Sequence, residues 1–327
     1  MPEADASGTL SGPATLRRMT RALQREKKSA GPRFGVRATG VCAVVLLLAS
    51  AAGAKSAPAQ RVVSLNPSLS AIALALGAEE ALVGVDDFSA RQQPALSDRP
   101  RVGGLFNPSL EAVVALAPDL VVLVPSAEQR DFKNRLEALG IRVESFENVR
   151  FDQVLENIER MGRLLGRQEE AVRRVSAIRR VRAELEAAMA GASRPTTVVV
   201  LQRDPLFVVG RGSFVEEMLQ AAGGTNVASR FDDPYPRVDV EWLVAAAPEV
   251  VIDMAPGSSE AVDFWSRWPT IPAVSKGRVL TLDPRLVTLP GPELDRGMRA
   301  LAEAIHGEGS VPRAQADGPV AAEESSP

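Results

Sequence analysis

The stretch SLEAVVALAPDLVVL at residues 109–123 returns in close form as DVEWLVAAAPEVVID at residues 239–253. In each copy a residue suited to capping a helix, Ser109 or Asp239, is followed two positions later by a glutamate. A Pro-acid pair then ends the helix, and an apolar run typical of a buried strand follows it. The sequence therefore predicts two copies of one helix–strand unit, one in each half of the chain.

Apolar runs alternate with helical patterns around both copies. Strands are predicted at 61–65, 82–86, 119–124 and 142–146 in the first half, and at 196–202, 206–210, 249–253 and 277–283 in the second. Helices are predicted at 67–77, 127–140 and 213–223, and a polar loop at 87–108. This alternation predicts parallel sheets that are covered by helices on both faces.

Residues 151–191 break the alternation. They carry no strand signal, and apolar residues recur at helical spacing from Val154 through Val172 to Leu185. The segment is predicted to be one long helix, or two collinear pieces joined at Gly166. Its mixed charges indicate a solvated face rather than a nucleic-acid surface.

The fold class predicted from these patterns is α/β, with two parallel-sheet lobes at 60–150 and 192–306 joined by one long rigid helix. Two similar lobes leave a cleft between them, which is a common place for a ligand. A helical connection resists hinge motion, so we expect the lobes to move little on binding.

The N-terminus has the composition of an export signal. A basic stretch precedes the apolar run ATGVCAVVLLLASAAGA, which ends in small residues, so residues 1–59 are predicted to be a signal peptide cleaved after Ala54 or Ala59. The alternative is an uncleaved membrane anchor, and Met19 is a second candidate start. The tail 307–327 is predicted to be disordered.

Composition excludes several chemistries. The chain of 327 residues has one cysteine, Cys42, and one histidine, His306, so neither a disulfide framework nor a zinc site with several Cys or His ligands can form. Its formal net charge is −3, and removal of the basic leader makes the remainder more acidic, which argues against nucleic acid as a partner.

The quoted stretches, together with RVVSLNPSLSAIALALGAEEALVGVDDFS at 61–89 and LFVVGRGSFVEEMLQAAGGTNV at 206–227, resemble the cobalamin- and ferric-siderophore-binding proteins of ABC importers. The vitamin B12-binding type is the most similar, and the resemblance covers roughly residues 61–306. It implies a class III periplasmic binding protein, two α/β lobes joined by a helix, that captures a metal chelate and delivers it to a membrane permease. A monomer without catalytic activity and without a resident cofactor is expected.

The resemblance also implies how the protein meets its permease. In that family an acidic residue on each lobe docks into a basic pocket of the permease, and Glu111 and Glu241 hold those positions in this sequence. A carboxylate in a first helical turn is favoured by the helix dipole and is free to meet an arginine.

The same resemblance implies ligand contacts in the cleft. Phe88, Phe207 and Tyr235 match aromatic ligand positions, and Asp283 matches a polar one. Phe106, or its neighbour Leu105, stands where a further aromatic residue is expected. Flat side chains suit a corrin or chelate face, so cobalamin is the preferred ligand and a ferric siderophore is an alternative.

Three other readings are weighed against a corrinoid. Haem would take Tyr235, the only tyrosine, as its iron ligand, whereas bare metal transport lacks a ligand set because the chain has one histidine. An α/β enzyme is the third. Its support is a G-x-G at 210–212 without the third glycine of a dinucleotide fingerprint, and the adjacent Asp86 and Asp87.

Overall fold

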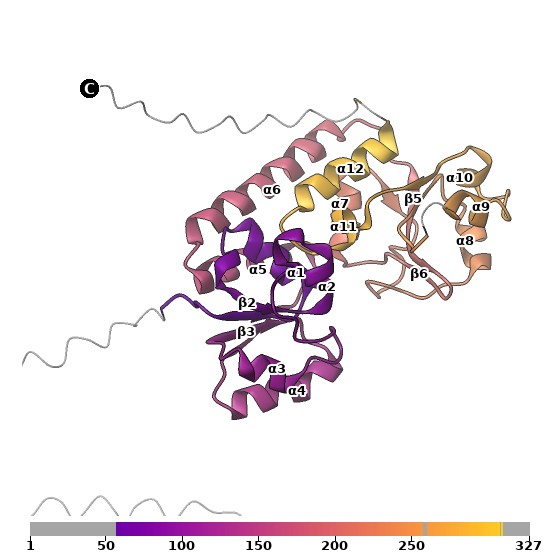
Figure 1. The fold of residues 1–327 in the computed structure, drawn as a ribbon. Coiled ribbons are helices and arrows are strands. Elements are labelled where there is room, and N and C mark those ends of the chain that lie inside the picture. Colours follow the sequence, from indigo (N-terminus) through magenta and orange to yellow (C-terminus); the bar gives the residue numbers. More distant parts are fainter. Residues whose placement is uncertain (1–56, 258–259, 308, 310–327) are drawn as a thin grey trace, which may run out of the picture. The chain divides into compact units, whose positions relative to one another are not determined.

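The computed structural model describes residues 57–257, 260–307 and 309 (Figure 1). Most of the predicted signal peptide and all but two residues of the predicted tail lie outside this part of the chain, and so does the lone Cys42. The described residues hold two β-sheets, each built from one half of the chain.

The first sheet contains four parallel strands in the order β2-β1-β3-β4. Helices α1, α2 and α5 lie on one side of it in Figure 1, and α3 and α4 lie on the other. The elements of this half are β1 (Val62–Ser64), α1 (Pro67–Ala75), η1 (Glu79–Ala81), β2 (Leu82–Val85), α2 (Asp87–Gln92), η2 (Pro94–Leu96), α3 (Leu110–Ala115), β3 (Leu120–Leu123), α4 (Ala127–Ala138) and β4 (Val143–Ser145).

The second sheet follows the path β6-β5-β8-β9, with β7 paired to β5. Its pairs are parallel except β5–β6, which is an antiparallel hairpin at the edge. The elements of this half are β5 (Thr196–Arg203), β6 (Leu206–Val208), α7 (Phe214–Ala221), β7 (Thr225–Asn226), α8 (Val240–Ala246), β8 (Val250–Asp253), α9 (Ala261–Trp265), α10 (Pro272–Ser275), β9 (Val279–Thr281), α11 (Pro284–Thr288) and α12 (Leu294–His306).

The predicted polar loop at 87–108 was wrong in part, because α2 and η2 lie within it. Asp86 directly precedes this segment and caps α2 by accepting hydrogen bonds from the backbone N–H groups of Phe88 and Ser89. A short helix held by one buried cap has too few residues to show a helical period in the sequence.

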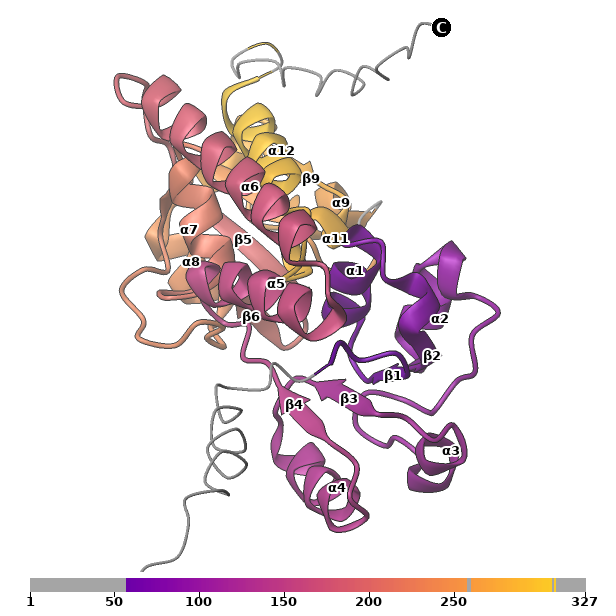
Figure 2. The same cartoon turned by 90° about the vertical axis from the view of Figure 1, so that its left-hand side faces the viewer.

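The connection between the halves consists of two helices, α5 (Phe151–Leu165) and α6 (Gln168–Ala188), and the prediction of one long helix was wrong. Gly166, with φ 69°, ends α5 in the left-handed conformation that glycine adopts without steric cost. The two helices run in different directions (Figure 2). They pack closely against each other, because a Cβ added to Gly162 would lie 2.5 Å from the Cβ of Ala171. They meet at Gly166 as predicted, but they are not collinear.

The buried face of α6 also differs from the predicted one. Its buried residues are Ala171, Val175, Ile178, Val181 and Leu185, whereas Val172 is exposed. Ala171 replaces Val172 on the apolar face because its small side chain fits against Gly162.

One hydrophobic core runs through both halves of the protein. It joins Ile72 of α1 and Ile158 of α5 to Val175 of α6, Met218 of α7 and Leu301 of α12. Two separate clusters cover the opposite sheet faces, one around Val121 in the first half and one around Val251 and Trp265 in the second. Separating the lobes would expose apolar surface from all five helices, so this shared core supports the expectation of little lobe movement.

The two copies of the repeated stretch have matching geometry. Ser109 caps α3 and Asp239 caps α8, each by accepting a hydrogen bond from a backbone N–H three residues later. After each helix an alanine adopts positive φ, 43° at Ala117 and 47° at Ala247. The duplication seen in the sequence is therefore also present in the backbone conformation.

The acid of each Pro-acid pair holds the start of the central strand of its sheet. Asp119 accepts hydrogen bonds from the backbone N–H groups of Gln60 and Arg61 at 2.8 and 3.2 Å, just before β1. Glu249 accepts one from the N–H of Thr196 at 2.9 Å, where β5 begins. The hydrogen bonds that Glu249 accepts from the backbone N–H and the hydroxyl of Thr196 lower the pKa of its carboxyl. The acids after the prolines thus have a structural role at the strand starts.

Replacing Ala117 and Ala247 with glycine is expected to stabilise the protein. The left-handed conformation costs an L-residue about 1–2 kcal/mol, and the greater freedom of glycine in the unfolded chain offsets about half of that gain. Urea unfolding of each variant should show about 0.5–1 kcal/mol more stability than wild type. The control Ala177→Gly, in the middle of α6, should lose about 1 kcal/mol. Equal losses at all three positions would contradict the proposed relief of strain.

Candidate functional site

A buried polar network positions α2 at the carboxyl end of β2. The Asp86 side chain is fully buried and accepts a short hydrogen bond from the Ser89 hydroxyl, in addition to the two backbone bonds that cap the helix. The Ser70 hydroxyl lies 2.8 Å from the hydroxyl of Ser89, which accepts from it, and 2.8 Å from that of Ser64. These contacts tie α2, and with it Phe88, to β1 and α1.

Asp86→Asn is expected to remove part of the pH dependence of stability. Burial raises the pKa of the Asp86 carboxyl above 3.8, although hydrogen bonds from Ser89 and Phe88 oppose the shift. The folded protein therefore keeps this proton to higher pH than the unfolded chain does. Wild type should lose stability as pH rises from 3.8 through the raised pKa, whereas the asparagine variant, which still caps the helix, should not.

The measurement is the urea-unfolding free energy of both proteins from about pH 3 to pH 7. Asp87→Asn, a half-buried neighbour, controls for the loss of one negative charge. Parallel profiles for wild type and Asp86→Asn would show that the buried carboxyl does not contribute to the pH dependence.

The two predicted aromatic residues of the first half are exposed. Phe88 is 39% exposed, and the Arg91 guanidinium lies 4.6 Å from its ring centroid, over one face. Phe106, in the loop before α3, is 71% exposed. Rings this exposed make few contacts within the protein, so they can stack on a flat ligand without breaking existing packing.

The two aromatic residues of the second half lie near each other on one sheet edge. Residues 234–238 run antiparallel along β6, with an isolated bridge between Phe207 and Arg237 and backbone hydrogen bonds from Val208 to Pro236 and from Gly210 to Pro234. This register puts Phe207 and Tyr235 at diagonal positions on the same face. Burial raises the pKa of the Tyr235 hydroxyl to about 12, so the phenol is neutral at physiological pH.

A buried ion pair underlies the carboxyl ends of β5 and β8. The Asp253 carboxylate is fully buried and accepts hydrogen bonds from Arg203, 2.9 Å from Nε, and from the indole Nε1 of Trp265 at 2.6 Å. Arg203 also donates to the carbonyl of Gly257 at 3.1 Å. The pair thus holds together two strand ends, α9 and the loop after β8.

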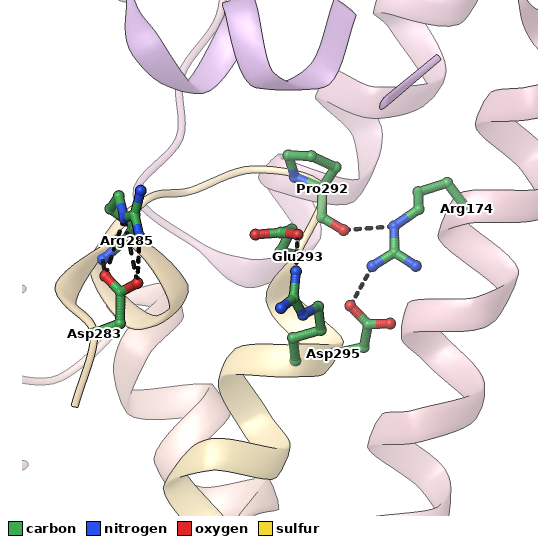
Figure 3. A network of polar contacts seen from close by, with 7 residues as sticks. Arg174, Asp283, Arg285, Pro292, Glu293 and Asp295 are labelled. Carbon is green, nitrogen blue, oxygen red and sulfur yellow. Dashed lines mark hydrogen bonds and ion pairs between the residues drawn. The ribbon is translucent and has the colours of Figure 1, made fainter. Parts of the chain in front are cut away.

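The pocket that Asp283 lines has a volume of about 680 Å³ and lies between α1 and α2 on one side and α6, α11 and the start of α12 on the other. Its lining residues are Ala71, Leu74, Ala75, Gln92, Gln93, Arg174, Asp283, Arg285, Leu286, Leu289, Gly291, Pro292, Glu293, Asp295 and Arg296. Figure 3 shows the polar contacts among its charged residues.

Asp283 is bound by its own neighbour. It caps α11 by accepting a hydrogen bond from the N–H of Arg285 at 3.0 Å, and its carboxylate also pairs with the Arg285 guanidinium, 2.8 Å from Nη2 (Figure 3). The hydrogen bonds from Arg285 lower the pKa of Asp283. This side chain therefore stays ionised and paired.

Glu111 and Glu241 are both exposed in the first turns of α3 and α8. The Ser109 hydroxyl donates to Glu111 at 3.3 Å. Next to Glu241, the Trp242 ring packs edge-on against Phe231, with centroids 5.1 Å apart, and its indole Nε1 is buried without a hydrogen-bond partner.

The structure brings some predicted site residues together and leaves others apart. Phe207 and Tyr235 share a sheet edge, whereas only Asp283 among the five predicted ligand residues lines the pocket. Arg174, Glu293, Asp295 and Arg296 were not predicted to line a ligand pocket. Arg174 lies among the mixed charges of α6. The only sequence feature that could have indicated its place in the pocket is its position beside the apolar face of that helix.

Within the described ranges no group of three or more His, Cys, Asp or Glu side chains is arranged to hold a metal ion. In the same part of the chain no helix combines the length and apolar character needed to cross a membrane.

Comparison with known proteins places these features in a family. The family model described as periplasmic binding protein matches residues 62–286. The vitamin B12-binding protein of Vibrio campbellii is 27% identical over 267 residues, which cover 80% of this chain and 94% of the relative.

Two solved structures share the fold. The periplasmic vitamin B12 binding protein of Vibrio cholerae superposes with a TM-score of 0.66 at 22% identity, over 76% of this chain and 97% of that one. A periplasmic haem-binding protein from Pseudomonas aeruginosa superposes with a TM-score of 0.65 at 29% identity, over 76% of this chain and 94% of that one.

The chain belongs to the periplasmic binding protein family, and its role is that of the substrate-binding subunit of an ABC importer. The predicted class III fold, two α/β lobes with a helical connection, is confirmed. The relatives named above are binding proteins rather than enzymes.

Proposed function

We propose that the substrate of this importer subunit is a metal chelate, a corrinoid by preference. The carrying observation is the exposed phenyl ring of Phe88, which α2 presents from the rigid Asp86 network and which is suited to a flat ligand face. Phe106, Phe207 and Tyr235 would add aromatic surface, and Asp283 would contribute a polar contact. The relative of Vibrio campbellii that matches most of this chain is named for vitamin B12.

The test is direct because the candidate ligands are coloured. The exported, processed protein is purified and titrated with cobalamin, haem and a ferric hydroxamate, and retained chelate is read by absorbance after gel filtration. Cobalamin is expected to remain bound at a one-to-one ratio. Retention of none of the three would overturn the proposal of a metal chelate. Retention of haem or the hydroxamate alone would keep the metal chelate but replace the corrinoid as the preferred ligand.

The contribution of the Phe88 ring to ligand binding can be tested without disturbing the fold, because the ring is exposed. Phe88→Ala is expected to weaken cobalamin binding by about tenfold, because a stacked ring contributes roughly 0.5–1.5 kcal/mol beyond its buried area. Phe88→Leu should recover part of the apolar contact, and Val262→Ala, at an exposed apolar position in α9, is the control. An unchanged affinity in Phe88→Ala would exclude this ring from the site.

Haem is the second candidate, favoured by the position of Tyr235 on the same sheet face as Phe207 and by the haem-binding structure that shares the fold. Its phenol would have to lose a proton to ligate ferric iron, and burial opposes that loss by raising the pKa to about 12. With haem bound, Tyr235→Phe should alter the visible spectrum if the phenolate is an iron ligand. An identical spectrum would exclude that ligation.

We also propose that the protein is exported, acts as a monomer and performs no chemistry. Ala59 donates its backbone N–H to Leu164 at 2.8 Å and is buried in the shared core. Cleavage after Ala54 would keep this contact and cleavage after Ala59 would remove it, so Ala54 is favoured. Mass spectrometry of the processed N-terminus would decide between these sites and an uncleaved anchor.

A further inference from the structure

Three ion pairs line the pocket between α1 and α11. Asp283 pairs with Arg285, Glu293 pairs with Arg296, and Asp295 pairs with Arg174 (Figure 3). Arg174 also donates from Nε to the carbonyl of Pro292, which fixes it across the start of α12. Each guanidinium that lines the pocket is thus matched by one carboxylate.

The pocket is therefore rich in charge but has no net charge from its side chains. A carboxylate entering it would find every guanidinium held by a carboxylate, and would place a fourth negative group among three. It could reach only the guanidinium N–H groups that point away from the paired carboxylates, and those carboxylates would repel its negative charge, so little affinity would result.

An uncharged carboxamide meets a different situation. Its carbonyl oxygen can accept from a guanidinium N–H that points away from the paired carboxylate, and its NH2 group can donate to a free carboxylate lone pair. The side-chain amides of Gln92 and Gln93, on the wall opposite the ion pairs, offer the same two functions. Such a group binds without breaking any of the three pairs.

We propose that this pocket receives uncharged, amide-bearing arms of the chelate, and that its three ion pairs select against ligands with peripheral carboxylates. This inference rests on the proposed function, since it assigns the periphery of the ligand rather than its metal centre. The pocket has walls from both halves of the chain, so an arm seated there contacts both.

The first test compares ligands that differ only in their arms. A metalloporphyrin with carboxylate arms is compared with its bis-carboxamide, and an amide-bearing corrinoid with the same corrinoid hydrolysed to carboxylic acids, by absorbance titration against the exported protein. The amide member of each pair is expected to bind about tenfold more tightly. Equal affinities, or tighter binding of the carboxylates, would overturn the inference.

The second test alters the pairing. Asp283→Asn and Glu293→Gln each leave one guanidinium unmatched, so each should shift the preference toward the carboxylate ligand by about tenfold. The matched control is Asp232→Asn, which removes the carboxylate that pairs with Arg211 at 2.9 Å on the surface, outside the pocket. Pocket variants that behave like this control would also overturn the inference.

The failure of the two proposals can be distinguished. If no chelate of either kind binds, the proposed function fails and the inference fails with it. If chelates bind with the same affinity whatever their arms, the proposed function stands and only the role of the ion pairs is wrong.

Discussion

Reversing the charge of both Glu111 and Glu241 is expected to abolish import while leaving ligand binding intact. Both side chains are exposed in the first turns of α3 and α8, one in each half of the chain, and neither lines the pocket. Lysine at these positions would face the basic permease pockets that the family resemblance implies. Loss of attraction and gain of repulsion together should weaken docking by at least about tenfold per site.

The measurement is binding of the ligand-loaded protein to its permease in nanodiscs, at low and high salt, together with uptake in cells. Each single variant should show a partial loss and the double variant a nearly complete one, with the salt dependence reduced. Matched controls are Asp152→Lys and Asp263→Lys, exposed acids in the first turns of α5 and α9. They carry the same helix-dipole penalty, so a similar defect in them would contradict specific docking.

Asp253→Asn is expected to destabilise the protein by about 3–5 kcal/mol, because it leaves the Arg203 guanidinium without its charge partner in a largely buried place. The asparagine oxygen can take the place of only one of the two carboxylate oxygens, and the NH2 group at the other place would face the donors that the carboxylate now accepts from. Urea unfolding followed by circular dichroism measures the change.

The control for this substitution is Asp232→Asn, which breaks a highly exposed pair with Arg211 and should cost less than about 1 kcal/mol. A loss of stability equal to that of the control would show that the buried pair contributes no more than a surface pair.

The order of strands and helices was predictable because each element carries its own local pattern. The duplicated stretch needed no more than a cap, an apolar face and a Pro-acid pair to be recognised in both halves. A break at Gly166 was predicted as one alternative, but the change of helix direction there was not. That change depends on the packing of Gly162 against Ala171, a contact between two helices that helical periodicity does not reveal.

The candidate site was less predictable. The five ligand residues and the two docking residues came from the resemblance, and their roles stay predictions. The charge balance of the pocket could not be foreseen, because the partner of Arg174 lies 121 positions further along the chain, at Asp295. Pairs within a few residues, such as Asp283 with Arg285, were visible as neighbours, yet nothing in the sequence indicated that all three pairs face one space.

The shared core makes the described fold a single cooperative unit despite its two sheets. Residues from α1, α5, α6, α7 and α12 contribute to one cluster, so neither half has a complete interior of its own. Partial unfolding of one sheet would leave the other with an exposed apolar face, and calorimetry should record one transition rather than two. An excised half would therefore lack part of the helical layer that covers its sheet.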